Sequence, residues 1–207
     1  MNSNISRISI PSQITHIGDG TFRNSQNLDY VEIKPDSTLV KIMEAAFYNT
    51  KIDEFIIPSS VTSIGDYAFN ETSIESLDIP EDSKLTKISE SAFANCSELK
   101  KVTIPRHVKK NCRLSFVLCF NLQNVEIPSD LELEDIEEGA FYTNQIKKLF
   151  IPSHVKILRS NAIYSINTIT LEFPPNSELQ EIENINFYAI NIPAGVTELS
   201  ITRKVHE

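Results

Sequence analysis

Cysteine and histidine are the side chains in this 207-residue chain that come nearest to a catalytic arrangement. Cys112 follows His107 by five residues, and a thiol beside an imidazole is the start of a nucleophile and base pair. Catalysis would also need a group that orients the base and donors for an oxyanion, and nothing in the segment 105–119 supplies either. We therefore predict no catalytic residues, and an enzyme or metal site in 105–119 is the alternative.

Cys96 and Cys119 occupy a different kind of position. Each stands three residues after an equivalent phenylalanine, where other parts of the chain carry Ser25, Thr50 and Thr72. That column takes small residues, and buried free thiols behave as small hydrophobes, which favours a packing role. A disulfide between the two stays open, because sequence spacing does not establish the required geometry.

Metal and cofactor binding are not predicted. His107 and His154 lie 47 residues apart in equivalent positions, with Glu132 between them. Zinc needs ligand atoms about 2.0–2.2 Å from the metal, so we interpret these histidines as surface turn residues. The acidic loops lack the spacing and glycine of a calcium loop, and five glycines provide no phosphate-binding loop.

The cysteines and histidines named above all lie within an internal sequence repeat. It is anchored on an apolar residue that recurs every 22 to 25 positions, at Phe22, Phe47, Phe69, Phe93, Phe116, Phe141, Ile163 and Phe187. An aliphatic residue stands eight positions before every anchor, and another stands five before, except at Asn111. One unit cannot bury its own apolar columns, but stacked units bury them against one another. The sequence therefore predicts a solenoid of about eight units.

Each unit contains one clear strand signal. Apolar residues alternate with polar ones for a few residues and then meet or approach a proline, as at Val31 and Ile33 or Phe55 and Ile57. Period-2 alternation predicts nine short parallel strands with one face buried. Between proline and anchor, stretches such as VTSIGDYAF place apolar residues three, seven and eight apart, which predicts short helical or 3₁₀ turns on the other face.

The segments IPSSVTSIGDYAF and SKLTKISESAFANCSELKKVTIP resemble the BspA-type leucine-rich repeat of bacterial and protozoan surface antigens. The likeness covers residues 5–201, with a charged tail at 202–207, so 1–207 is one domain. It implies an α/β repeat fold, a curved right-handed leucine-rich-repeat solenoid without enzymatic activity, used for adhesion or protein binding and often displayed at a cell surface. Two units depart from the pattern, those anchored at Phe116 and Phe187.

Short and long units alternate, and charge follows the alternation. The long segments 32–47, 78–93, 126–141 and 172–187 hold 18 acids and four lysines, a net charge of -14. The remaining chain holds 28 - 18 = 10 acids and 19 - 4 = 15 bases, a net charge of +5. Two interpretations stay open: a striped binding face for a basic or mixed-charge partner, or interleaving that relieves repulsion between coils about 5 Å apart.

The outward side of the strands carries our candidate site. One position alternates between carboxylates and other residues, and large apolar groups project beside it, where partner anchors are expected. The predicted partner-binding residues are Tyr30, Glu32, Ile56, Asp78, Glu126, Phe150 and Glu172. Scattered exposed hydrophobes are common on monomers, so the apolar members also have a purely structural interpretation.

The expected partner is a protein. The formal charge of -9 disfavours nucleic acid, and no apolar run is long enough for membrane insertion. Family resemblance favours the cell surface, whereas the absence of a signal sequence favours a cytoplasmic scaffold. The absence of a dedicated cap before the first strand favours a fragment of a larger repeat protein. Ile5, Ile8 and Ile10 start almost at the first residue, and an uncovered strand predicts weak end-to-end self-association.

Overall fold

The computed structural model describes residues 4–111, 113–165, 169–184, 193–196 and 198–200. Within these ranges only the backbone is described for Asp78, Lys110, Asn111, Thr143 and the strand 198–200. The anchor Phe187, the predicted strand at Ile190 and Ile192, and the tail 202–207 lie outside the described residues.

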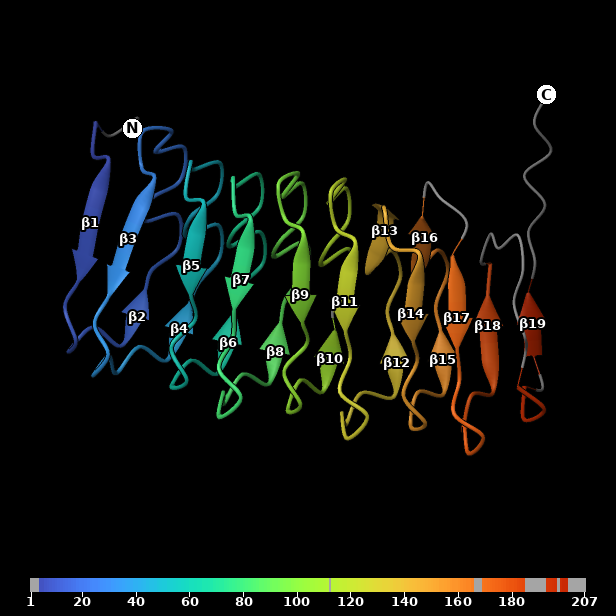
Figure 1. The fold of residues 1–207 in the computed structure, drawn as a ribbon. Helices are drawn as coiled ribbons and strands as arrows, with labels where there is room; N and C mark the ends of the chain where they lie inside the picture. The colour runs from blue at the N-terminus through green and yellow to red at the C-terminus, as the bar shows by residue number, and fades with distance from the viewer. Residues whose placement is uncertain (1–3, 112, 166–168, 185–192, 197, 201–207) are drawn as a thin grey trace, which may run out of the picture.

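One face of the solenoid is formed by the strands that alternation predicted. They are β1 (Arg7–Ile10), β3 (Tyr30–Ile33), β5 (Glu54–Ile56), β7 (Ser76–Asp78), β9 (Lys101–Thr103), β11 (Asn124–Glu126), β14 (Lys148–Phe150) and β17 (Thr170–Glu172). Figure 1 shows them side by side in chain order. Every pairing between them is parallel, and we call their solvent side the outward strand face.

A second row of strands lies where the sequence predicted helical turns. It contains β2 (His16–Ile17), β4 (Lys41–Ile42), β6 (Ser63–Ile64), β8 (Lys87–Ile88), β10 (Lys110–Asn111), β12 (Asp135–Ile136), β15 (Ile157–Leu158), β18 (Glu181–Glu183) and β19 (Glu198–Ser200). These strands form one sheet, and Figure 1 shows them running opposite to the first row. Asn111 keeps the register with Ile88 and Ile136, so the unit that departs from the pattern keeps its backbone ladder.

The third side of each coil is a chain of turns, and the structure contains no helix in the residues it describes. The predicted helical or 3₁₀ turns are not observed because the backbone enters the left-handed region on both sides of the anchor. Around Phe69, Tyr67 has φ 57° and Glu71 has φ 58°. A left-handed residue cannot continue a right-handed helix. Instead, the Phe69 amide donates to the Ala92 carbonyl of the next coil over 2.8 Å.

Two short strands continue this third side near the C-terminal end, β13 (Phe141–Asn144) and β16 (Ile163–Ser165). Their first residues, Phe141 and Ile163, are two of the anchors and are fully buried. The anchor column therefore passes from the turns into a strand pair whose register shifts between Tyr142 and Asn144.

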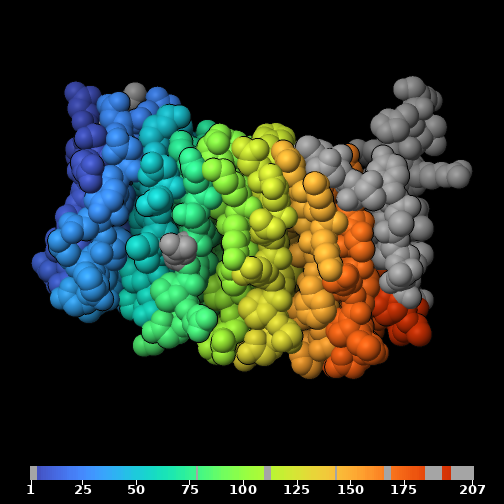
Figure 2. Space-filling view, in the orientation of Figure 1, coloured from blue at the N-terminus to red at the C-terminus, as the bar shows by residue number. Residues whose placement is uncertain are grey.

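The hydrophobic core consists of apolar residues at the same position in successive coils, which stack on one another. The rings of Phe69 and Phe93 are stacked with centroids 5.2 Å apart, and those of Phe93 and Phe116 follow at 5.3 Å. The aliphatic residues eight and five positions before the anchors are also buried, except that Ile14 at the N-terminal end is half-buried. Figure 2 shows the resulting coils as bands that follow one another along the molecule. The fold is thus the predicted parallel-strand solenoid, built from sheets and turns.

Candidate binding surface

Among the residues that the structure describes, the outward strand face consists of three sheets, which are β1–β3, the four strands β5, β7, β9 and β11, and β14–β17. Three or four residues are in register within the pairs β1–β3, β5–β7, β9–β11 and β14–β17. In contrast, β7 meets β9 at one position, Ser76 and Lys101. In the part of the chain that the structure describes, no pairing joins β3 to β5 or β11 to β14. The longest registers therefore lie within the pairs of coils predicted from the sequence, while β7 and β9 stay joined in one sheet.

The breaks between pairs follow the long acidic segments. Equivalent core residues are 22 or 23 positions apart within a pair, as from Phe55 to Leu77. They are 24 or 25 positions apart across a break, as from Val31 to Phe55. Among the described residues the longer step goes with a shortened or absent ladder: β7 and β9 keep one paired position, and β3 and β5 keep none.

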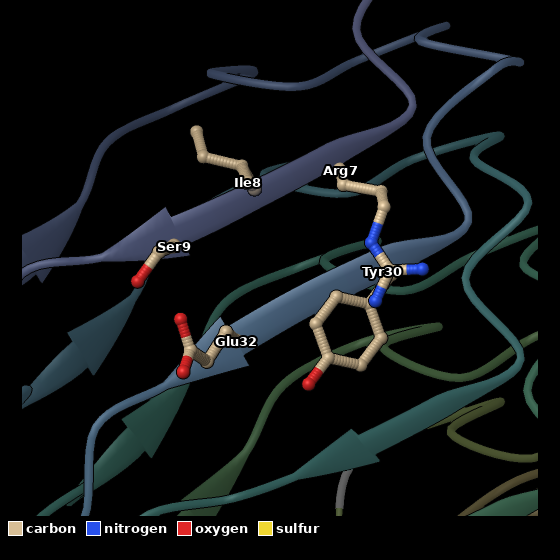
Figure 3. A pocket seen from close by; sticks show the side chains of 5 residues that line it. All are labelled: Arg7, Ile8, Ser9, Tyr30 and Glu32. Carbon is tan, nitrogen blue, oxygen red and sulfur yellow. The ribbon is translucent and has the colours of Figure 1, made fainter.

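The first pair is held by side chains as well as by its backbone (Figure 3). The Arg7 guanidinium lies over the Tyr30 ring, 4.1 Å from its centroid. Beside them, Ser9 and Glu32 point toward each other across β1 and β3. Hydrogen bonds from Lys34 and Ser9 to the Glu32 carboxylate lower its pKa.

The predicted carboxylates are bonded to cations rather than free. Lys34 Nζ is 2.7 Å from Glu32, and Lys148 Nζ is 2.9 Å from Glu172. Glu126 has Lys101 Nζ at 2.8 Å, and this lysine lowers the pKa of the carboxyl together with the Thr103 hydroxyl. The Asp78 side chain lies outside what the structure describes. Three of the four acids therefore carry a counter-charge. Lys34 comes from the same acidic segment as Glu32, whereas Lys101 and Lys148 come from neighbouring basic coils, and these two pairs favour interleaving.

A cleft of about 490 Å³ opens at the first break, between β3 and β5. Its lining includes three of the predicted residues, Tyr30, Glu32 and Ile56. It also includes residues that the sequence did not identify as site residues, namely Ile33, Lys34, Pro35, Glu54, Pro58 and Pro80. The 24-residue step from Val31 to Phe55 is the sequence signal that marks this place.

Phe150 lies elsewhere on the same face. Its side chain is 38% exposed, and four steps along the face separate β14 from β5, roughly 19 Å at ordinary strand spacing. The crevice at the break beside it is about 170 Å³ and is lined by polar residues such as Asn124 and Lys148. The structure thus brings Tyr30, Glu32 and Ile56 together and places Glu126, Phe150 and Glu172 apart from them.

Cys96 and Cys119 are buried free thiols. Cys96 Sγ donates to the Phe69 carbonyl over 3.1 Å, and Cys119 Sγ donates to the Phe93 carbonyl over 3.2 Å. Burial raises the pKa of Cys96 to about 11 and raises that of Cys119 well above 9.0. Protonated thiols in the interior are inert, which agrees with the predicted packing role.

The alternative catalytic and metal sites gain no support. Cys112 lies outside the described residues, so its relation to His107 is not described. His154 Nδ1 lies 3.3 Å from Glu178 on the surface. Among the residues that the structure describes, no three acidic, histidine or cysteine side chains could hold a metal ion.

These features define the class of protein: a solenoid repeat protein with parallel strands and a continuous core of stacked apolar residues. The BspA type leucine rich repeat model matches the sequence in six copies, over residues 1–123 and 62–193. The chain therefore belongs to the BspA-type leucine-rich repeat family, as the resemblance indicated. No curated protein matches it.

Several solved structures share the fold at low sequence identity. A leucine-rich cell surface protein from Faecalibacterium prausnitzii is 23% identical with a TM-score of 0.63, over 95% of this chain and 78% of that one. A leucine-rich repeat protein of T. pallidum is 19% identical with a TM-score of 0.55, over 96% and 74%. One from Eubacterium ventriosum is 20% identical with a TM-score of 0.50, over 98% and 61%. The described residues contain no helix that could span a membrane.

Proposed function

We propose that this chain is a non-enzymatic adhesion or protein-binding module that presents its outward strand face to another protein. The observation that carries the proposal is the apolar exposure on that face, where Ile56 is 62% and Tyr30 is 42% exposed. Contiguous apolar patches mark contact sites, and a few clustered anchors dominate binding; Tyr30 and Ile56 line the same cleft. Phe150 extends this pattern toward the C-terminal half of the face.

The shape supports an extended partner. Eight strands at about 4.8 Å spacing span roughly 34 Å, which is long enough for several contacts in a row. Repeat solenoids bind through such surfaces because their curvature and length fit extended partners. Neither the family nor the fold indicates a catalytic function, which supports a binding role.

We place the protein at the cell surface, on the strength of its family and of the surface protein from Faecalibacterium prausnitzii that shares its fold. Limited proteolysis of intact cells that express the chain tests this location. Cleavage without lysis is expected, whereas protection until lysis would favour the cytoplasmic scaffold.

Partner capture with matched variants tests the function itself. The test variant carries Ile56→Ser and Phe150→Ser, which change exposed side chains and leave the core intact. The control is Phe120→Ser, because Phe120 is also exposed, at 45%, but follows the anchor Phe116 on the turn side. Proteins captured from envelope and matrix fractions should be lost with the double variant alone. Equal capture by all forms would contradict the proposal.

A further inference from the structure

We propose that the cleft between β3 and β5 binds an extended peptide segment of a protein partner that carries a lysine or arginine two positions from a large aliphatic residue. This inference rests on the proposed protein-binding function and names the chemistry of the partner. It is based on the shape, the lining and the charge of the cleft.

The lining provides an apolar floor with polar edges. Ile56, Pro58 and Pro80 supply aliphatic surface, and Tyr30 supplies an aromatic ring at the opposite strand. Ile56 is the most exposed large hydrophobic residue in the described part of the chain. An aliphatic side chain laid against it would remove apolar surface from both partners, which is favourable.

The charge of the cleft identifies the second feature of the ligand. Of its two carboxylates, Glu32 is bonded to Lys34 at 2.7 Å. Glu54 forms no ion pair with any residue that the structure describes. Glu54 thus differs from the neutralised acids of the face and is available to a cation from a partner.

The distance between the apolar contact at Ile56 and the carboxylate of Glu54 is set by the geometry of β5. Glu54 and Ile56 lie on β5 two residues apart, so both side chains face outward about 6.6 Å from each other. An extended peptide has the same repeat, and its residues i and i+2 face the same way. A basic residue and an aliphatic residue at that spacing therefore meet Glu54 and Ile56 together.

A titration with short peptides tests the assignment. The probes are blocked heptapeptides of serine and glycine that contain one lysine and one leucine two positions apart, in either order. The matched control has lysine and leucine adjacent, which points them to opposite sides in an extended chain. Amide shifts of the ¹⁵N-labelled intact chain report where each peptide binds.

We expect the i, i+2 peptides to shift β3 and β5 and to bind Ile56→Ser about tenfold more weakly. Glu54→Gln should weaken binding about threefold at low salt and have no effect at high salt. Phe150→Ser should bind like the wild type. Equal binding of the adjacent-residue control, shifts confined to other strands, or no shifts would overturn the assignment. If partner capture still depends on Phe150 in that case, the proposed function stands without this cleft.

Discussion

Thr103 and Glu126 lie opposite each other on β9 and β11, and Thr103 Oγ1 donates a 2.8 Å hydrogen bond to Glu126 Oε2. Lys101, on the same strand as Thr103, holds the other carboxylate oxygen at 2.8 Å. The acidic coil is therefore bonded to the basic coil before it. The same relation recurs between Lys148 and Glu172 on the last pair.

Arg159 is the strongest such link on the second sheet, and its loss should be measurable. Its guanidinium lies 2.8 Å from both Asp135 and Glu183, in coils on either side, and all three side chains are partly buried. We expect Arg159→Gln to lower the free energy of unfolding by about 1–2 kcal/mol, because bonds to charged groups are lost. Arg106→Gln is the matched control, since Arg106 makes one exposed contact with Asp130 at 3.6 Å, and it should change little.

The effect of Arg159 should depend on pH in one direction. Burial raises the pKa of Glu183, but bonds from Arg159 and Ser160 outweigh it and hold the pKa below 4.5. A carboxyl with a lowered folded pKa stabilises the fold above its unfolded pKa and loses that contribution as pH falls. Urea unfolding at pH 7 and pH 3 should therefore show the difference between wild type and Arg159→Gln shrinking in acid. A constant difference would contradict this assignment.

The two buried thiols should be protected from alkylation. Their raised pKa values keep Cys96 and Cys119 protonated at pH 8, and their burial excludes the reagent. In a Cys112→Ser background, iodoacetamide should label neither thiol in the folded protein and both after urea denaturation. If either thiol in the folded protein reacted as fast as a cysteine in an unstructured peptide, the thiols would be accessible to solvent and the prediction would be wrong.

A phenylalanine in the middle of the stacked column should contribute more to the free energy of unfolding than one at its end. Phe93 is fully buried between Phe69 and Phe116, whereas Phe22 has one stacked neighbour, Phe47. Phe93→Ala should cost about 3–5 kcal/mol of unfolding free energy through lost burial and a cavity. Phe22→Ala should cost less. Chemical denaturation of both variants measures the difference, and equal losses would argue against a continuous spine.

Binding of a partner should depend weakly on ionic strength. Glu32, Glu126 and Glu172 are already paired with lysines, so apolar contacts rather than the acidic stripe should supply most of the affinity. Once a partner is in hand, its affinity at low and high salt should agree within about threefold. A steep fall in affinity as the salt concentration rises would indicate that the acidic stripe supplies the binding.

The N-terminal end should support weak self-association. Among the described residues, β3 is the only strand paired with β1, and Ile5 next to it is exposed. An unpaired strand edge is a template for another strand. Sedimentation should show a dimer that grows with concentration, and Ile5→Glu should reduce it. A monomer at all concentrations would refute the prediction.

The strands and the spine could be predicted because their signals are local and repeated. Alternation at Val31 and Ile33, and the phenylalanine period, need nothing from the rest of the molecule. The second sheet could not be read this way, because a two-residue strand such as Lys41–Ile42 contains no alternation. The left-handed turns could not be predicted either, since glycine marks only Gly20 and Gly139 among the described left-handed positions, and residues such as Tyr67 and Leu114 fill others.

The candidate site was predicted in part for a similar reason. Outward positions follow from strand alternation, so Tyr30 and Ile56 were found on the exposed face. The ion pairs depend on the register between coils, and the cleft depends on a ladder that fails between β3 and β5. Both are relations between units, which no single repeat contains.

Photo-crosslinking from defined positions tests the central claim most directly. A photoreactive phenylalanine analogue placed at Ile56, Phe150 or the control position Phe120 would be activated in the presence of envelope and matrix proteins. We predict that the first two positions yield the same protein adduct and that Phe120 yields none. Adducts at Phe120 alone, or equally at all three positions, would contradict binding through the outward strand face.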